Sequence, residues 1–75
     1  MNVNSFRVKL FRSTDAEQLT NDVNDYLHIC DREGTDILDV TYQPYRASGG
    51  ATIHTYTVKH AAYTREEVEQ YHKRN

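Results

Sequence analysis

The sequence predicts a small α+β domain in which one amphipathic helix packs on one face of a three-stranded antiparallel sheet. Apolar residues recur at steps of three and four between Thr14 and Cys30, while the segments on either side alternate as strands do. The order strand, helix, strand, strand, helix is the third observation. It divides the chain into a β-α-β-β domain over residues 1–63 and a short C-terminal helix with a tail over residues 64–75.

The first predicted strand covers residues 3–12. Its apolar residues take every second position: Phe6, Val8 and Leu10. This period of two is typical of a half-buried strand, so we expect these three side chains to face the core. Phe11 is the exception, because it falls on the polar side of the pattern with the basic residues.

The central helix is predicted to begin at Thr14, because Thr14 and Glu17 have the spacing of a capping box. Gly34 can adopt the left-handed conformation that closes a helix. The apolar stripe between them is formed by Ala16, Leu19, Val23, Leu27 and Cys30. We interpret Cys30 as a packed residue and not as a reactive thiol, because no lysine or arginine lies close to it in sequence to lower its pKa.

Two further strands are predicted over residues 37–46 and 52–60, joined by a glycine-containing hairpin loop. Pro44 has no backbone N–H to give to a neighbouring strand, which places the first of these strands at an edge or a bulge. With that constraint we favour the strand order 1-3-2. In the last strand we expect Tyr56 and Val58 to face the core.

The C-terminal helix is predicted from residue 65 to about residue 72. Thr64 and Glu67 repeat the capping-box spacing. Only Val68 and Tyr71 form its apolar stripe, so we expect this helix to bury little surface by itself.

Length and composition restrict the class of protein. The chain has 75 residues, of which 37% are hydrophobic, and a single domain of this size is near the lower limit for a self-sufficient core. Oligomerisation would stabilise it. One cysteine excludes an intramolecular disulfide framework, and no apolar run is long enough to cross a bilayer. Without a secretory signal in the first residues either, we expect a cytoplasmic protein with no membrane partner.

The second face of the sheet is the expected functional surface, and the sequence leaves open whether this face is bare, covered by the C-terminal helix or paired with another copy of the chain. Acidic residues concentrate on the central helix, whereas basic and aromatic residues concentrate on the strands. We expect ligand or partner binding by six of them: Arg7, Lys9, Phe11, Tyr45, Arg46 and Lys59.

Two classes of function fit this surface. The first is a non-enzymatic interaction protein that self-associates, as a homodimer or a higher oligomer, and recognises a protein partner. The second binds an anion, a nucleotide or single-stranded nucleic acid, because arginine and tyrosine on a sheet resemble a stacking platform. The net charge of −2 counts against the second class. A phage-encoded form of either would inhibit a host protein or sequester a nucleotide.

The sequence contains no convincing catalytic or metal-ligating set. His28 and Cys30 are two residues apart on a helix and point apart, and His54 and His60 are six residues apart on a strand, roughly 20 Å. We therefore expect no enzymatic activity, no cofactor and no metal site.

Residues 8–11 leading into the acidic helix, the stretch 18–27, and the strand at 37–42 resemble a family of small sporulation proteins. These proteins occur in Bacillus and related Firmicutes and are controlled by the mother-cell sigma factor E. The resemblance covers roughly residues 3–63 and implies a small α+β protein with no assigned enzymatic activity. It supplies no catalytic residues. Similar small open reading frames occur in phages of these bacteria, which leaves a phage origin open.

Overall fold

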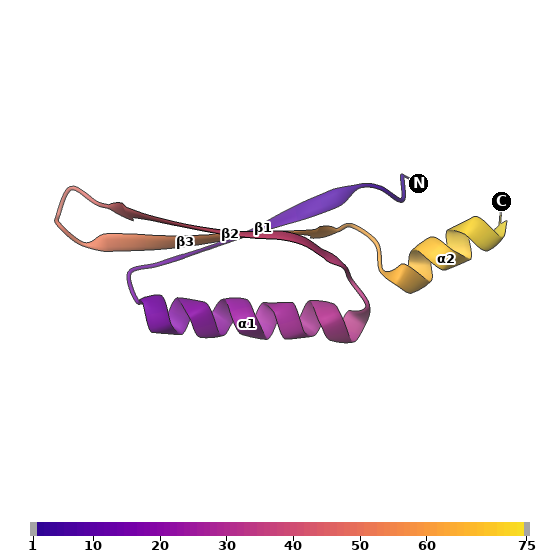
Figure 1. Cartoon of the computed structure of the whole chain (residues 1–75), viewed down its shortest axis with the longest axis horizontal. Coiled ribbons are helices and arrows are strands. Elements are labelled where there is room, and N and C mark those ends of the chain that lie inside the picture. The colour runs from indigo at the N-terminus through magenta and orange to yellow at the C-terminus, as the bar shows by residue number, and fades with distance from the viewer. Residues whose placement is uncertain (1, 75) are drawn as a thin grey trace.

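A computed structural model describes residues 2–74 of the chain (Figure 1). In chain order the elements are β1 (Phe6–Ser13), α1 (Ala16–Glu33), β2 (Ile37–Arg46), β3 (Thr52–Ala61) and α2 (Arg65–Arg74). The strands form one antiparallel sheet in the order β1-β3-β2. The predicted fold class and strand order are therefore confirmed. Residue 75, at the end of the predicted tail, lies outside the described residues.

Helix α1 lies along one face of the sheet and has well-defined ends (Figure 1). Asp15 is the N-cap, and its side chain accepts a hydrogen bond of 3.0 Å from the amide of Gln18. The predicted cap at Thr14 is wrong by one residue. A carboxylate in this position also interacts favourably with the positive end of the helix dipole. At the other end Gly34 has a φ of 78°, the left-handed conformation predicted for it.

The core between α1 and the sheet is narrow. Among the described residues, four hydrophobic side chains are buried: Leu19, Val23, Cys30 and Val58. The first three lie on the apolar stripe of α1 and the fourth lies at the centre of β3. The burial of Cys30 and Val58 agrees with the sequence analysis. Because so few side chains are buried, most of the sheet surface contributes little to the stability of an isolated chain.

The register of the sheet shows which side chains share a face with the helix. Phe11, Tyr56 and Tyr42 lie directly opposite one another on the three strands, so they are on the same face. The ring of Phe11 meets the ring of Tyr26 on α1 edge-on, with centroids 5.5 Å apart. This row therefore faces α1, and Tyr56 is on the core side as predicted.

Strand β1 is turned the other way from the prediction. Phe11 faces the helix, and period-two alternation places Arg7 and Lys9 on that side with it. Phe6, Val8 and Leu10 consequently point away from α1, and each is more than half exposed. The expectation that these three residues form the core face is wrong. The physical reason is that a shift of one residue exchanges the two faces of a strand. Here the contact between Phe11 and Tyr26 fixes which face of β1 meets α1.

Strand β2 pairs only with β3 and is an edge strand, as Pro44 indicated. Its register shifts between Ile37 and Asp39, at the opposite end from the proline. The hairpin to β3 closes with a hydrogen bond of 2.8 Å from the Ala47 amide to the Ala51 carbonyl, and Gly50 has a φ of 86°. A positive φ of this kind favours glycine.

Helix α2 extends beyond the end of the sheet (Figure 1). The predicted capping box forms: the Thr64 amide donates to Glu67 Oε1 at 2.9 Å, and the Glu67 amide donates to Thr64 Oγ1 at 3.1 Å. The start of α2 is tied to the domain by an ion pair between Arg65 and Asp36. None of its described side chains is buried. The helix therefore attaches to the domain by its first turn.

Candidate functional site

Exposed large hydrophobic side chains concentrate on the two edge strands. Nine are at least 37% exposed among the described residues, three of them on β1, five on β2 and one on α1. We call Phe6, Val8 and Leu10 the β1 stripe. We call Ile37, Leu38, Val40 and Tyr42 the β2 stripe. The remaining two are Tyr45 and Ile29. The central strand contributes none, because α1 and its two neighbours cover it.

The β1 stripe lies on the open face, by which we mean the sheet face that points away from α1. Phe6, Val8 and Leu10 are 53%, 58% and 56% exposed. Across the sheet from Val8 lies Lys59, and Asp39 follows on β2 in the same row. This stripe is therefore an apolar strip along one edge, with Lys59 beside it on β3 and Arg12 following Leu10 on the same face of β1.

Both positive charges of the open face lie against aromatic rings. The ammonium of Lys59 is 4.1 Å from the centroid of the Phe6 ring. The guanidinium of Arg12 donates a hydrogen bond to the hydroxyl of Tyr45 and lies 5.6 Å from the centroid of that ring. Such cation–π contacts and the aliphatic stems of these side chains cover part of the rings.

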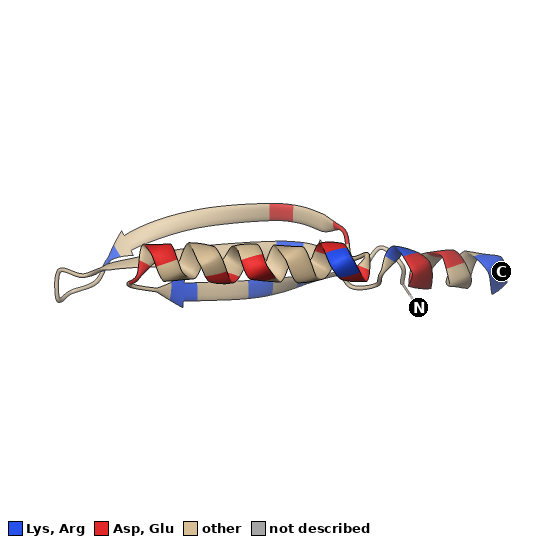
Figure 2. Cartoon of the chain, turned by 90° about the horizontal axis from the view of Figure 1, so that it is seen from below, with Lys and Arg blue, Asp and Glu red and all other residues tan. Residues whose placement is uncertain are grey.

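The β2 stripe lies largely on the helix side of the sheet but outside the area that α1 covers. Figure 2, seen from below, shows α1 in front of the sheet with β2 separate from it on one side. The helix packs on β1 and β3. Tyr42 stacks on His54 with centroids 5.9 Å apart, and their side chains share a hydrogen bond of 2.6 Å. Tyr42 is held in place but remains accessible.

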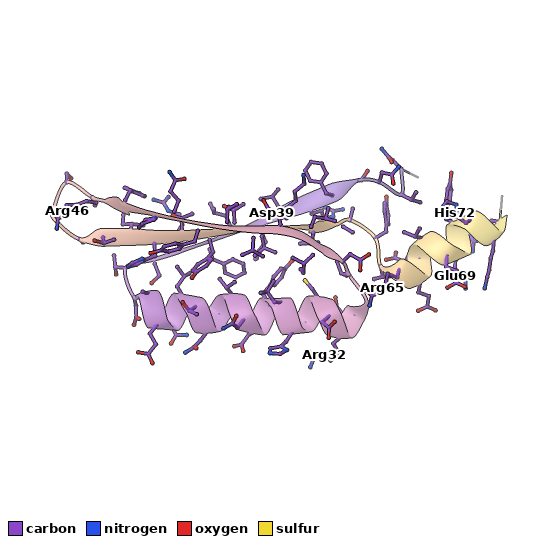
Figure 3. The ribbon with its side chains drawn as sticks, in the orientation of Figure 1. Arg32, Asp39, Arg46, Arg65, Glu69 and His72 are labelled. Atoms are coloured by element: carbon purple, nitrogen blue, oxygen red, sulfur yellow. The ribbon has the colours of Figure 1, made fainter. Side chains whose placement is uncertain are left out.

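The structure does not bring the six predicted binding residues together. On the helix side lie Arg7, Lys9 and Phe11, and on the open face lie Tyr45 and Lys59. Arg46 pairs with Thr52 at the hairpin end of the sheet, as Figure 3 also shows. The expectation of one basic and aromatic face is therefore wrong. The cause is the orientation of β1, which moves half of the set to the other side. The binding roles of the six residues stay predictions.

Lys9 and Phe11 instead belong to a cluster that holds α1 on the sheet. The Lys9 ammonium is 5.9 Å from the ring centroids of both Phe11 and Tyr26. The Tyr26 hydroxyl and His60 Nε2 are 2.8 Å apart, and His60 Nδ1 is 2.9 Å from the Ala61 carbonyl oxygen. A carbonyl only accepts, so in the neutral ring Nδ1 carries the proton and Nε2 accepts from Tyr26.

Burial, and then the nearby Cys30, raise the pKa of Tyr26 above the 10.0 that is usual for tyrosine. Tyr26 therefore stays neutral, with its hydroxyl proton available for a hydrogen bond, throughout the physiological pH range. The cluster is a structural contact between helix and sheet, in which Tyr26 and His60 are hydrogen-bonded to each other.

A cavity of about 360 Å³ lies where the segment before β1 meets the start of β2, the end of β3 and the start of α2. Its apolar lining includes Val3, Leu38, Ala61, Tyr63 and Val68. The polar groups beside it include Asp36 and Arg65, which already form an ion pair with each other. Because Leu38 also belongs to the β2 stripe, the cavity and the stripe form one continuous apolar surface. This arrangement can receive an apolar side chain.

Sequence reasoning missed the β1 stripe as a surface, because it assigned these residues to the core. One signal was present: Phe11 on the polar side of the strand pattern marked that side as the one that packs.

The chain was compared with protein families, curated proteins and solved structures. No family model, curated protein or solved structure matches it significantly. The resemblance to the sporulation family therefore stays a prediction.

The described residues also bear on metals and membranes. Within residues 2–74, no three His, Cys, Asp or Glu side chains come together as they would around a metal ion. Neither described helix has the length and apolar character to span a bilayer.

Proposed function

We propose that the chain is a small non-enzymatic binding protein that recognises a protein partner through the apolar residues of its edge strands. The observation that carries this proposal is the distribution of exposed large hydrophobic side chains, eight of nine of which lie on β1 and β2. Apart from Tyr45, they form two separate stripes on opposite faces of the sheet, and a run of exposed apolar side chains such as each stripe is costly to leave in water and marks interaction sites.

The charge distribution supports a protein partner over a nucleic acid. A platform for single strands combines accessible aromatic faces with cations that follow the phosphate backbone. On the open face, Lys59 and Arg12 already lie against Phe6 and Tyr45. Both apolar stripes are free of charged residues, and the net charge of the chain is −2.

We assign partner recognition to the β2 stripe. It borders an unpaired strand edge, and an extended segment of another protein can add to such an edge through main-chain hydrogen bonds. Pro44 limits the pairing to the part of β2 that precedes it. This is the part that carries the stripe and leads to the cavity at Leu38, which would accommodate an apolar side chain of the partner.

The experiment begins with capture and ends with purified components. The tagged full-length chain is cross-linked in its own host cell, and each captured protein is purified and titrated calorimetrically. We expect saturable binding with a negative heat-capacity change, the mark of apolar burial. The double variant Leu38→Ser with Tyr42→Ser should bind at least about tenfold more weakly. The matched control is Asn24→Ser, an exposed position on α1.

Two results would overturn the proposal. One is a purified partner that binds the folded double variant as tightly as the wild-type chain, with folding checked by circular dichroism. The other is strong, steeply salt-dependent binding of short single-stranded DNA or RNA by the wild-type chain, when no captured protein binds it. That outcome would establish the nucleic-acid class instead.

A further inference from the structure

We propose that the open face binds a second copy of this chain, with two sheets stacked face to face and their β1 stripes in contact across a two-fold axis. This inference rests on the proposed function, because it takes an exposed apolar stripe as a binding surface and names its occupant. It leaves the β2 stripe free for a different protein.

The surface area of the chain is larger than a monomer of this mass normally exposes. The accessible surface is 5555 Å². A folded monomer of 8.8 kDa is expected to expose about 4,800 Å². The difference of about 800 Å² equals the share that one partner buries in a protein–protein interface of standard size. The molecule has extents of 55 × 21 × 12 Å, and both the bare sheet face and the α2 helix that extends beyond the sheet add to its exposed surface (Figure 1).

The core of the single chain is small. The four buried hydrophobic side chains of the described residues lie between α1 and the sheet. The β1 stripe holds three more large apolar residues that contribute nothing to that core. Domains of this size commonly need a further source of stability, and association of two copies supplies it by burying such residues.

The chemistry of the open face fits a second sheet. On the open face, the central strand β3 carries Thr55 and Thr57, whose short side chains allow close approach. The charged residues Lys59 and Asp39 are adjacent on neighbouring strands, so neither charge lacks a counterpart of opposite sign when the face approaches a copy of itself. Lys59 lies over the Phe6 ring and Arg12, which is also on this face, lies over the Tyr45 ring, so each cation enters the contact already paired with an aromatic ring.

The position of the helix explains why this face and not the other stacks. Sheets that pack face to face lie about 10 Å apart, which requires that nothing projects between them. Helix α1 covers the opposite face and prevents such an approach there (Figure 1). A two-fold contact through the β1 stripe needs only one kind of surface, since an isologous interface pairs a patch with itself.

Sedimentation equilibrium of the full-length chain tests the proposal over a wide range of concentration. We expect the wild-type chain to approach twice its mass of 8.8 kDa. Leu10→Glu should sediment as a monomer, because it places two carboxylates in the contact. The matched control Leu38→Glu, an equally exposed leucine on the β2 stripe, should remain a dimer.

A milder variant covers the case in which Leu10→Glu does not fold. Leu10→Ala should raise the dissociation constant of the dimer at least about tenfold, because both copies lose the same contact. The proposal is overturned by a wild-type chain that is monomeric at every concentration. It is equally overturned by a dimer that Leu38→Glu dissociates, or by an unchanged dissociation constant in Leu10→Ala.

The two proposals fail in different ways. A monomeric chain that still binds a captured protein through the β2 stripe overturns the dimer and leaves the proposed function in place. A dimer dissociated by Leu10→Glu, for which no captured protein binds when purified, overturns protein recognition by the β2 stripe alone.

Discussion

Strands β1 and β2 are similar in sequence pattern and opposite in outcome. Both alternate apolar and polar residues, and both lie at an edge of the same sheet beside β3. Strand β1 turns its basic residues toward α1 and its apolar residues away from it. Strand β2 turns Val40 and Tyr42 toward the helix side, where α1 does not cover them. The difference shows that alternation defines two faces without saying which of them meets the helix.

The row of Phe11, Tyr56 and Tyr42 makes the comparison concrete. These three rings share one face, yet Phe11 contacts α1 through Tyr26 while Tyr42 contacts only its own sheet, through Tyr56 and His54. The helix is therefore anchored over β1 and β3. Substitutions that weaken the packing of α1 on β1 and β3 should therefore separate the contributions of β1 and β2 to stability.

The largest loss of unfolding free energy is expected from a buried residue of α1 that packs on the sheet. Leu19→Ala should lower the free energy of unfolding by about 3 kcal/mol, because Leu19 is 2% exposed and its truncation leaves a cavity. Leu10→Ala, the same change at a residue 56% exposed, should cost less than about 0.5 kcal/mol. Both are measured by urea unfolding at a concentration at which the chain is monomeric. Equal losses would show that the β1 stripe is part of the monomer core.

The next largest effect compares Phe11 on β1 with Tyr42 on β2, which share one row of the sheet. Phe11→Ala should lower the free energy of unfolding by about 2 kcal/mol, since it removes the edge-on contact with Tyr26 as well as packing against the sheet. Tyr42→Ala should cost about 1 kcal/mol or less, because Tyr42 lies outside the area of the sheet that α1 covers. The same urea titrations measure both variants. A larger loss for Tyr42→Ala would contradict the placement of α1 over β1.

The smallest effect concerns the hydrogen bond between Tyr26 and His60. Tyr26→Phe should lower the free energy of unfolding at neutral pH by about 1 kcal/mol. The pKa of Tyr26 is raised in the folded state, so the stability that its neutral hydroxyl contributes is complete below pH 10.0, the ordinary pKa. That contribution is lost as the pH rises through the higher folded-state pKa.

The measurement for Tyr26→Phe is therefore made at two pH values. The difference in unfolding free energy between the wild-type chain and the variant should shrink above pH 10. The other five tyrosines are present in both proteins, so their effects cancel in this difference. A difference that stays constant into alkaline solution would count against the half-buried, hydrogen-bonded hydroxyl.

Much of the fold follows from local chemistry. Gly34 and the pair Thr64 and Glu67 act within a few residues of their own position, so the ends that they mark were predictable. Pro44 lacks a donor wherever it lies, which is why it placed β2 at an edge. The start of α1 was predicted one residue early, because Thr14 and Asp15 are both competent caps and only the path of the chain out of β1 selects between them.

The candidate surfaces depended on a longer-range decision. Each strand has two faces, and the energy that selects one comes from contacts with residues far away in sequence, such as that between Phe11 and Tyr26. The pattern of β1 by itself favours its three aliphatic and aromatic residues for the core. The tertiary structure instead places one phenylalanine under the helix and leaves the other three apolar residues exposed.

The sequence was sufficient to predict the elements, the ends marked by Gly34 and by Thr64 with Glu67, the strand order and the buried side of β3, because these depend on local capping, hairpin geometry and the stripe of α1. Only the tertiary structure decided the orientation of β1, the position of α1 over one edge of the sheet, and hence which apolar residues remain exposed. The physical reason is that a period of two is symmetric between the faces of a strand, and only packing against another element breaks that symmetry.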